Sequence, residues 1–333
     1  MKPLVSIISP CYNGETYVGR FLDSILAQNY PNIEVIIIND GSKDKTENVI
    51  LSYKQKFEDK GYKFYYIYQN NAGQSAAINQ GLKVFHGKYM TWIDSDDVLV
   101  SDAISEKVSF MEKNPTIGLA ICKIKVIDYL TDEEIGEQVR IQPEGEETFF
   151  YDIIAGNNVF YTPGGYFVRS EMFKDAMPKP LQIEAPREIG QNFQLLLPIS
   201  YKYPIGYIDR YLFRYSVRQD SHSRERHSFE ERKHILHISY TVLNNIINQI
   251  SFKCTSDKRA AVEAVEKRII VAELSLLQKY KRKDNIKNIE NRIKELKLQN
   301  IAFSAMILEV KYPWMKCFLD FIYSLKHLSI FKS

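Results

Sequence analysis

Residues 5–46 read VSIISPCYNGETYVGRFLDSILAQNYPNIEVIIINDGSKDKT and contain two continuous apolar runs with an amphipathic stretch between them. The first run ends in a loop after Cys11, and the second, Ile33 to Ile38, ends in an acidic, turn-rich segment. Between them, over residues 17–28, apolar residues recur at the three- and four-residue spacing of a helix. This stretch therefore predicts a strand, a helix and a second strand.

The same alternation continues to residue 94. The sequence predicts a helix from about residue 46 to 57, a strand over 62–70, a helix over 75–85 and a strand over 89–94. Strands and helices that alternate at this spacing predict an α/β fold, a parallel sheet with helices on both faces.

Ligands of such sheets bind beyond the carboxyl ends of the strands, so the residues that follow each strand are informative. The sequence has no GxGxxG after the first strand and no GxxxxGK[ST], which disfavours a dinucleotide or P-loop site. The residues that follow the four strands are mostly polar and include Pro10, Tyr12, Asn13 and Glu15, then Asn39, Asp40 and Ser42, then Asn71 and Gln74, and finally Asp94, Ser95, Asp96 and Asp97.

The stretch MTWIDSDDVL, residues 90–99, places three carboxylates within four residues. Like charges this close repel each other, and a divalent cation bound to a diphosphate would relieve the repulsion. In an extended segment Asp94 and Asp96 point the same way, so that one can reach a ribose and the other a metal ion. Asp40 is able to accept a hydrogen bond from a base imide N–H. The alternative, that the triplet caps the following helix, suits Asp97 better than the other two.

Residues 5–46, NNAGQSAAINQGL (70–82) and GKYMTWIDSDD (87–97) resemble the nucleotide-binding half of family-2 glycosyltransferases, which have the GT-A fold. The resemblance implies a GT-A catalytic domain over residues 1–225, with a nucleotide-binding half over 1–115 and an acceptor half over 116–225. It implies inverting transfer of a hexosyl or N-acetylhexosaminyl group from a UDP-sugar, assisted by Mn²⁺ or Mg²⁺. The acceptor would be an oligosaccharide or a lipid-linked sugar in bacterial capsule or cell-surface polysaccharide synthesis, with no nucleic-acid partner.

The segment YSVRQDSHSR, residues 215–224, departs from the family, because Arg218 stands where relatives often have a histidine before a Ser-x-Ser. Cationic and hydroxyl groups in this loop suit a diphosphate leaving group, so we expect Arg218 to act as a phosphate clamp and His222 to complete the metal shell. A surface histidine without a ligand role is the alternative for His222. The implied nucleotide-binding residues are Pro10, Tyr12, Asn13, Glu15, Asp40, Gln74, Asp94, Ser95, Arg218 and Ser223, and the implied metal ligands are Asp96 and His222.

The sequence departs from the family in PREIGQNFQLLLPISY, residues 186–201, where Gln191 and Asn192 replace the usual Glu-Asp pair. An amide cannot take up a proton at neutral pH, so either the catalytic base lies elsewhere, or this stretch does not align with the family's pair, or the activity is altered. If residues 187–197 form a helix, Glu188 lies one turn before Asn192 and is our candidate base. Glu188 is equally well explained as a carboxylate at a helix start. Gln191 and Asn192 would then hydrogen-bond acceptor hydroxyls. A protein that binds nucleotide-sugar or organises partner enzymes without catalysis is the rival hypothesis.

The segment NNVFYTPGGYFVR, residues 157–169, is expected to form the floor of the acceptor pocket. Its two glycines, Gly164 and Gly165, allow close backbone approach. Its aromatic residues either stack on a sugar or pack in the core.

From residue 226 to 333 the sequence predicts a helical domain. Two amphipathic helices, over about 262–280 and 286–296, are separated by a turn at 281–284 and form an antiparallel pair. Their default role is packing, including self-association into a homo-oligomer. The tail, residues 311–333, sets aromatic and apolar residues on one stripe among lysines, which suits either a membrane interface or packing.

Charge and composition limit the location. Residues 216–333 carry 22 basic and 13 acidic residues, whereas the preceding part is acidic overall. The chain has four scattered cysteines, no signal peptide and no apolar run long enough to span a membrane. We expect a cytoplasmic protein, either free or peripheral on the inner face of the membrane.

Overall fold

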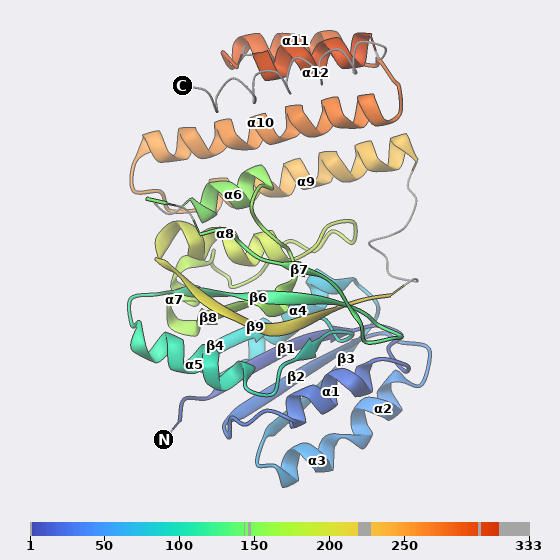
Figure 1. Cartoon of the computed structure of the whole chain (residues 1–333), viewed down its shortest axis with the longest axis vertical. Coiled ribbons are helices and arrows are strands. Elements are labelled where there is room, and N and C mark those ends of the chain that lie inside the picture. Colours follow the sequence, from blue (N-terminus) through green and yellow to red (C-terminus); the bar gives the residue numbers. More distant parts are fainter. Residues whose placement is uncertain (1, 143, 146–147, 219–227, 299–300, 313–333) are drawn as a thin grey trace. The chain divides into compact units, whose positions relative to one another are not determined.

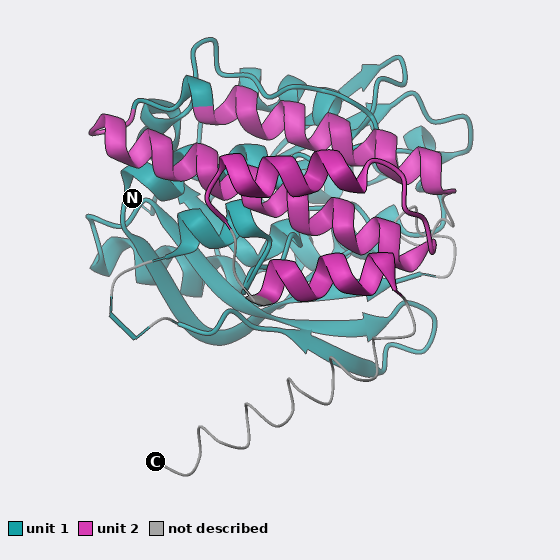
Figure 2. Cartoon of the chain, turned by 90° about the horizontal axis from the view of Figure 1, so that it is seen from above, with its two compact units in different colours: residues 1–225, 248–251 teal, residues 226–247, 252–333 magenta. Residues whose placement is uncertain are grey.

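The computed structural model describes residues 2–142, 144–145, 148–218, 228–298 and 301–312. The chain divides into two compact units (Figure 2), one of residues 1–225 with 248–251 and one of residues 226–247 with 252–333.

The first half of the first unit alternates strands and helices as the sequence predicts. β1 and β2 are buried along their whole length, which is why most of their residues are apolar. In chain order the elements are β1 (Val5–Cys11), α1 (Val18–Leu26), β2 (Ile33–Asp40), α2 (Thr46–Ser52), α3 (Lys54–Asp59), β3 (Lys63–Gln69), α4 (Gln74–Val84) and β4 (Tyr89–Trp92). The single helix expected over 46–57 is two helices, because the N–H of Tyr53 bonds the carbonyl of Ile50, three residues back, and tightens the chain there.

The second half completes the sheet with mixed pairings. Its elements are β5 (Val98–Leu99), α5 (Ala103–Lys113), β6 (Leu119–Asp128), β7 (Glu134–Gln138), α6 (Phe149–Ala155), a 3₁₀ turn (Pro163–Gly165), β8 (Tyr166–Arg169), α7 (Ser170–Ala176), α8 (Asn192–Lys202) and β9 (Ile205–Val217). The sheet order is β3-β2-β1-β4-β8-β6-β9-β5, with β7 paired to β6 (Figure 1).

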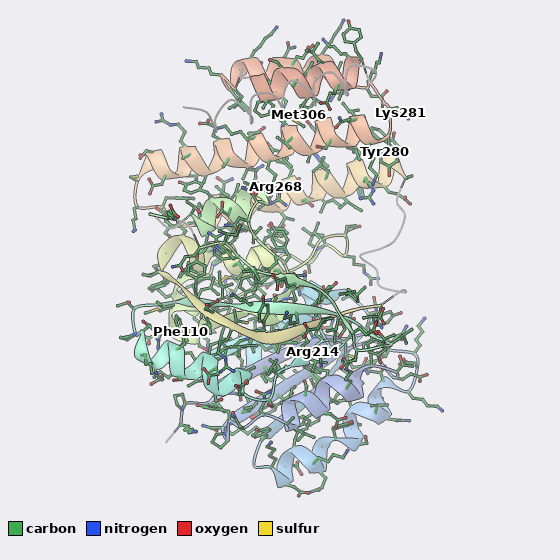
Figure 3. The ribbon with its side chains drawn as sticks, viewed as in Figure 1. Phe110, Arg214, Arg268, Tyr280, Lys281 and Met306 are labelled. Atoms are coloured by element: carbon green, nitrogen blue, oxygen red, sulfur yellow. The ribbon has the colours of Figure 1, made fainter. Side chains whose placement is uncertain are left out.

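Strands β1 to β4 pair in parallel, whereas β8 runs antiparallel to both β4 and β6. Figure 1 shows α1, α2 and α3 together below the sheet, and α4 packs against β1 and β2. Right-handed crossovers place α4 on the opposite face, because the chain reverses direction along the sheet after β3. The expected α/β fold with helices on both faces is confirmed. Side chains fill the space between the sheet and these helices (Figure 3).

The second unit is helical and contains most of α9 (Phe229–Gln249) and all of α10 (Thr255–Lys279), α11 (Ile286–Glu295) and α12 (Ile301–Lys311). The expected helix pair corresponds to α10 and α11. Arg292 of α11 joins them through ion pairs to Glu266 and Glu273 of α10, at 2.9 and 2.7 Å. Tyr280, labelled in Figure 3, packs edge-on against Phe229. Within the described residues no helix is long and apolar enough to cross a membrane.

Candidate active site

The loops after β1 and β2 are cross-linked by hydrogen bonds at the carboxyl edge of the sheet. Asn13 adopts a left-handed backbone conformation (φ 49°), and its N–H donates to Oγ of Ser42 at 2.9 Å. Its own Oδ1 accepts from the N–H of Lys43 at 3.0 Å. Glu15 likewise accepts from the N–H of Lys45 at 2.7 Å. Asn13 and Glu15 therefore fix the conformation of these loops, which form the rim of the sheet at its carboxyl edge. The ring of Tyr12 is exposed beside them.

Asp40, at the end of β2, holds the loop between β3 and α4. Its Oδ1 accepts from Nε2 of Gln69 (2.6 Å) and from the N–H of Ala72 (2.9 Å), and its Oδ2 accepts from the N–H of Gly73 (2.9 Å). Gly41 makes this contact possible, because its φ is +72° and a Cβ there would lie 2.6 Å from the backbone nitrogen of Asn71. A carboxylate offers about four acceptor sites, so Asp40 retains capacity for one further donor.

The acidic loop after β4 lies next to the N-terminus of α4. Nε2 of Gln74, the first residue of α4, donates to Oδ1 of Asp94 at 2.6 Å. Burial and the charge of Asp96 raise the pKa of Asp94 to about 7, although the hydrogen bond from Gln74 opposes the shift. The same two causes, with the repulsion from Asp94 added, raise the pKa of Asp97 well above its usual range. The loop thus holds negative charge at a cost, as its sequence predicts.

Asp97 ties the acidic loop to the last strand of the sheet rather than capping a helix. Its Oδ1 accepts from the N–H of Ser216 in β9 at 2.8 Å, and its buried Oδ2 has no hydrogen-bond partner within the described residues. β5, which follows at once, pairs antiparallel with β9. The next helix, α5, begins six residues later at Ala103.

This connection places Arg218, just after β9, beside the acidic loop. Nε of Arg218 lies 3.1 Å from Oδ2 of Asp96, and its guanidinium lies 4.1 Å from the centre of the Tyr17 ring. Tyr17 in turn donates its hydroxyl to the carbonyl of Tyr12 at 2.7 Å. Sequence reasoning missed Tyr17, because an aromatic residue at the start of an apolar helix reads as core.

Two further predicted residues lie beneath this rim. Pro10 is buried within β1, and Ser95 is buried beside Cys11, whose thiol it hydrogen-bonds. Desolvation nevertheless raises the pKa of Cys11 to about 12, so the thiol stays protonated. Ser223 and His222 lie outside the described residues, as does the predicted amphipathic tail from residue 313 onward.

The side chain of Asn192 connects three segments, β4, the loop at Tyr161 and the start of α8. Its Oδ1 accepts from the indole N–H of Trp92 in β4 at 2.6 Å, and its Nδ2 donates to the carbonyl of Tyr161. An indole N–H only donates and a carbonyl only accepts, so the orientation of the amide is fixed. Both ends of the Asn192 side chain are therefore engaged within the protein.

The expected helix over 187–197 is wrong at its start. α8 begins at Asn192, and Arg187 and Glu188 lie in an exposed turn, so the helical-phase argument for Glu188 fails. The physical reason is a long-range contact: Arg187 donates to the carbonyl of Asn71, and its Cγ lies 3.2 Å from where a Cβ of Gly73 would be. That contact holds the turn of residues 187 and 188 against the loop that precedes α4. The first residue of α4, Gln74, donates a hydrogen bond to Asp94.

Gln191 is 1% exposed, and neither atom of its amide has a hydrogen-bond partner within the described residues. A buried amide without partners costs free energy, so this position has capacity for a polar ligand or water.

The expected floor of the acceptor pocket is a packed aromatic layer. The ring of Tyr166 stacks with those of Trp92 and Phe160, at centroid distances of 6.4 and 5.2 Å, and Tyr166 is fully buried. Gly164 has no room for a side chain, because a Cβ would lie 2.0 Å from the Phe213 ring. Packing, rather than sugar stacking, accounts for Phe160 and Tyr166.

The chemistry of the acidic loop fits a divalent cation supported by few protein ligands. Within the described residues there is no group of three or more His, Cys, Asp or Glu side chains arranged to hold a metal ion. Mg²⁺ and ions like it are commonly bound by one or two carboxylates, with substrate phosphates and water completing the shell. Asp96, with Asp94 beside it, offers such a donor set.

A mixed sheet with this order and an acidic rim defines an α/β protein of the GT-A type, and solved structures agree. The fold is similar to that of S. aureus TarS, residues 1–349, in complex with UDP-GlcNAc, with a TM-score of 0.60 and 17% identity over 83% of this chain and 81% of that one. It is also similar to the mannosyltransferase PcManGT from Pyrobaculum calidifontis in complex with GDP-Man and Mn²⁺, with a TM-score of 0.56 and 15% identity over 94% of this chain and 82% of that one. At these identities the likeness shows the fold alone.

Sequence comparison identifies the family. Residues 6–176, just over half of the chain, match the model of glycosyl transferase family 2, and the chain belongs to that family. It is 42% identical over 128 residues to an uncharacterized glycosyltransferase of Rickettsia prowazekii, covering 38% of each chain. It is 27% identical over 248 residues to the minor teichoic acid biosynthesis protein GgaB of Bacillus subtilis, covering 74% of this chain and 26% of that protein. The chain thus matches less than half the length of both relatives.

Proposed function

We propose that this protein transfers a sugar from a UDP-sugar to a hydroxyl of an oligosaccharide or lipid-linked acceptor, with inversion, in the synthesis of a bacterial surface polysaccharide. The observation that carries the proposal is the convergence of Asp94, Asp96 and Arg218 at one edge of a GT-A sheet. Family membership and the similarity to a teichoic acid biosynthesis protein support the reaction class and the kind of product.

The rim supplies the parts that donor binding needs. The Tyr12 ring is available to stack on uracil, and Asp40 has capacity for one donor such as the imide N–H. Asp94 would accept from a ribose hydroxyl, and Arg218 would bind the diphosphate, whose negative charge grows as the sugar leaves. A divalent cation bound at Asp96 would supply further positive charge to the diphosphate.

The catalytic base remains a proposal centred on Glu188. The support for Glu188 is that it is exposed and directly follows Arg187, whose side chain contacts Asn71 and lies close to Gly73 in the loop before α4. A positioned base contributes roughly 10²- to 10⁴-fold. We expect Glu188→Gln to lower kcat by about that factor and to leave UDP affinity unchanged. Glu184→Gln is the matched control and should retain kcat. A loss of less than tenfold for Glu188→Gln would make Glu188 a structural carboxylate.

The rival function is a transferase-like protein that binds nucleotide-sugar without catalysis. It is favoured by one observation: the position of the family's acid is an amide engaged by Trp92 and Tyr161. Calorimetry with UDP and Mn²⁺, followed by a UDP-release assay over a panel of UDP-sugars with cell-envelope acceptors, separates the two. Release by the wild type but not by Asp96→Asn supports the transferase. Tight binding without release supports the binding protein.

We also propose contact of the basic C-terminal part with anionic membranes, and self-association through its helices as the alternative use of the same surface. The support is the excess of basic residues over 216–333. Deleting residues 313–333 should release the protein from anionic vesicles at low salt and spare UDP binding. A full-length protein that does not pellet with such vesicles, and that elutes as a dimer, would favour self-association.

A further inference from the structure

Arg218 neutralises the very carboxylate that is proposed to hold the metal ion. Its Nε lies 3.1 Å from Oδ2 of Asp96, and only 15% of the Arg218 side chain and 22% of the Asp96 side chain are exposed. An ion pair this far buried is screened by water less than a surface pair. The guanidinium also lies 4.1 Å from the centre of the Tyr17 ring, which is within the range of a cation–π interaction.

The backbone that carries Arg218 is fixed to the same loop. The N–H of Ser216 donates to Asp97 at 2.8 Å, and β9 pairs with β5 directly after the acidic triplet. The backbone of Arg218 therefore stays close enough for its side chain to reach Asp96, whether the guanidinium is paired with Asp96 or with another group. Its long side chain can change partner without any movement of the strand.

A single carboxylate cannot balance a guanidinium and a divalent cation at once. The two cations repel each other, because the interaction scales with the product of their charges and is strong in a partly buried site. A diphosphate relieves this repulsion fully, because its oxygens accept paired hydrogen bonds from the guanidinium fork.

We propose that Arg218 is the counter-ion of Asp96 when no ligand is bound, and that it transfers to the nucleotide diphosphate when the metal ion arrives. Binding of the metal ion and binding of the nucleotide are then coupled. The metal ion displaces Arg218 from Asp96 and frees it for the diphosphate, and the diphosphate binds the guanidinium that would otherwise repel the metal ion. Each ligand therefore raises the affinity for the other by the same factor. This inference rests on the proposed function. It gives Arg218 a second role besides binding the diphosphate, which is to pair with Asp96 before the ligands bind.

The test measures Mn²⁺ binding without nucleotide, by electron paramagnetic resonance, in the full-length protein. We expect Arg218→Gln to bind Mn²⁺ alone about tenfold more tightly than the wild type, and to bind UDP in the presence of Mn²⁺ at least tenfold more weakly. Arg218→Lys retains the charge but not the fork, so its affinity for Mn²⁺ alone should stay near that of the wild type while its UDP affinity falls. Adding Asp96→Asn to Arg218→Gln should abolish the gain in Mn²⁺ affinity.

Arg214 provides the matched control. It lies four residues earlier in β9, is labelled in Figure 3, and pairs with Asp132 at 3.1 Å. Arg214→Gln removes the same charge four residues away, within β9, and should change neither affinity. The exchange is refuted if Arg218→Gln binds Mn²⁺ alone no more tightly than the wild type, or if Arg214→Gln shows an equal gain. Failure of the wild type to bind UDP with Mn²⁺ would instead contradict the proposed function.

Discussion

Asn192, which the sequence resemblance aligns with a catalytic carboxylate, makes two structural hydrogen bonds through its side chain. Its amide bridges an N–H donor on Trp92 and a carbonyl acceptor on Tyr161, whereas an ionised carboxylate can only accept and so cannot make both bonds. In Asn192→Asp a carboxylate oxygen would face the Tyr161 carbonyl. We expect this variant to lose about 1–3 kcal/mol of unfolding free energy, measured by urea denaturation, and to gain no activity.

Asn288→Asp, at an exposed position of α11, makes the same chemical change and should stay within about 0.5 kcal/mol of the wild type. A stable Asn192→Asp enzyme with faster turnover would show that the position accepts a base after all.

Asp94 makes the stability of the ligand-free protein depend on pH. Its pKa in the folded protein is about 7, whereas an aspartate in an unfolded chain titrates near about 3.9. Between these values the folded protein keeps a proton that the unfolded chain has released. The contribution of Asp94 to the free energy of unfolding therefore falls as pH rises from about 4 to about 7.

Asp94→Asn removes the titrating group and keeps an oxygen for Gln74. We expect it to be more stable than the wild type at pH 7.5 in EDTA, with the difference shrinking toward pH 5. Urea midpoints at the two pH values measure this. Equal pH slopes for variant and wild type would rule out a raised pKa at Asp94.

At the scale of elements, features that depend on local patterns can be predicted from the sequence, whereas features that depend on long-range contacts cannot. The sequence predicts β1, β2 and the rim residues Asp40 and Asp94 because apolar runs and strand-end residues are local signals. The hydrogen bond between Trp92 and Asn192 joins residues 100 positions apart, and the Arg187 contact joins residues 116 apart. Neither pairing has a local signature, so the start of α8 was predicted five residues too early. The ion pair of Arg218 with Asp96 is of the same kind, because β5 and β9 bring the two together.

The 3₁₀ turn before β8 depends on the absence of a side chain at Gly164. A Cβ there would meet Phe213 ring atoms at 2.0 and 2.1 Å, within a fully buried layer. We expect Gly164→Ala to cost about 1–3 kcal/mol or more by overpacking, measured by thermal and urea unfolding. Gly190→Ala is the control, since no atom lies within 4 Å of its Cβ position, and it should be neutral or slightly stabilising. Equal stability of the two variants would mean that the layer can yield.

At the scale of the whole chain, every described residue assigned to the nucleotide lies in the first of two compact units. The described residues of the second unit carry the helix pair joined by Arg292, with its own buried apolar cluster between α10, α11 and α12. Units with separate cores unfold separately unless their interface is large, so a single transition is not the default expectation.

We therefore expect calorimetry to show two unfolding transitions, of which UDP with Mn²⁺ shifts only one. A ligand present at 100 times its Kd stabilises the unit that binds it by about 2.7 kcal/mol. For a unit of this size that is a rise in Tm of about 5–10 °C, because each kcal/mol is worth about 2–4 °C. Asp96→Asn should show both transitions in the absence of ligand and no shift in its presence, which separates binding from general salt effects. A single transition that moves as a whole would show that the units unfold together, and a shift confined to the helical transition would remove the nucleotide site from the sheet.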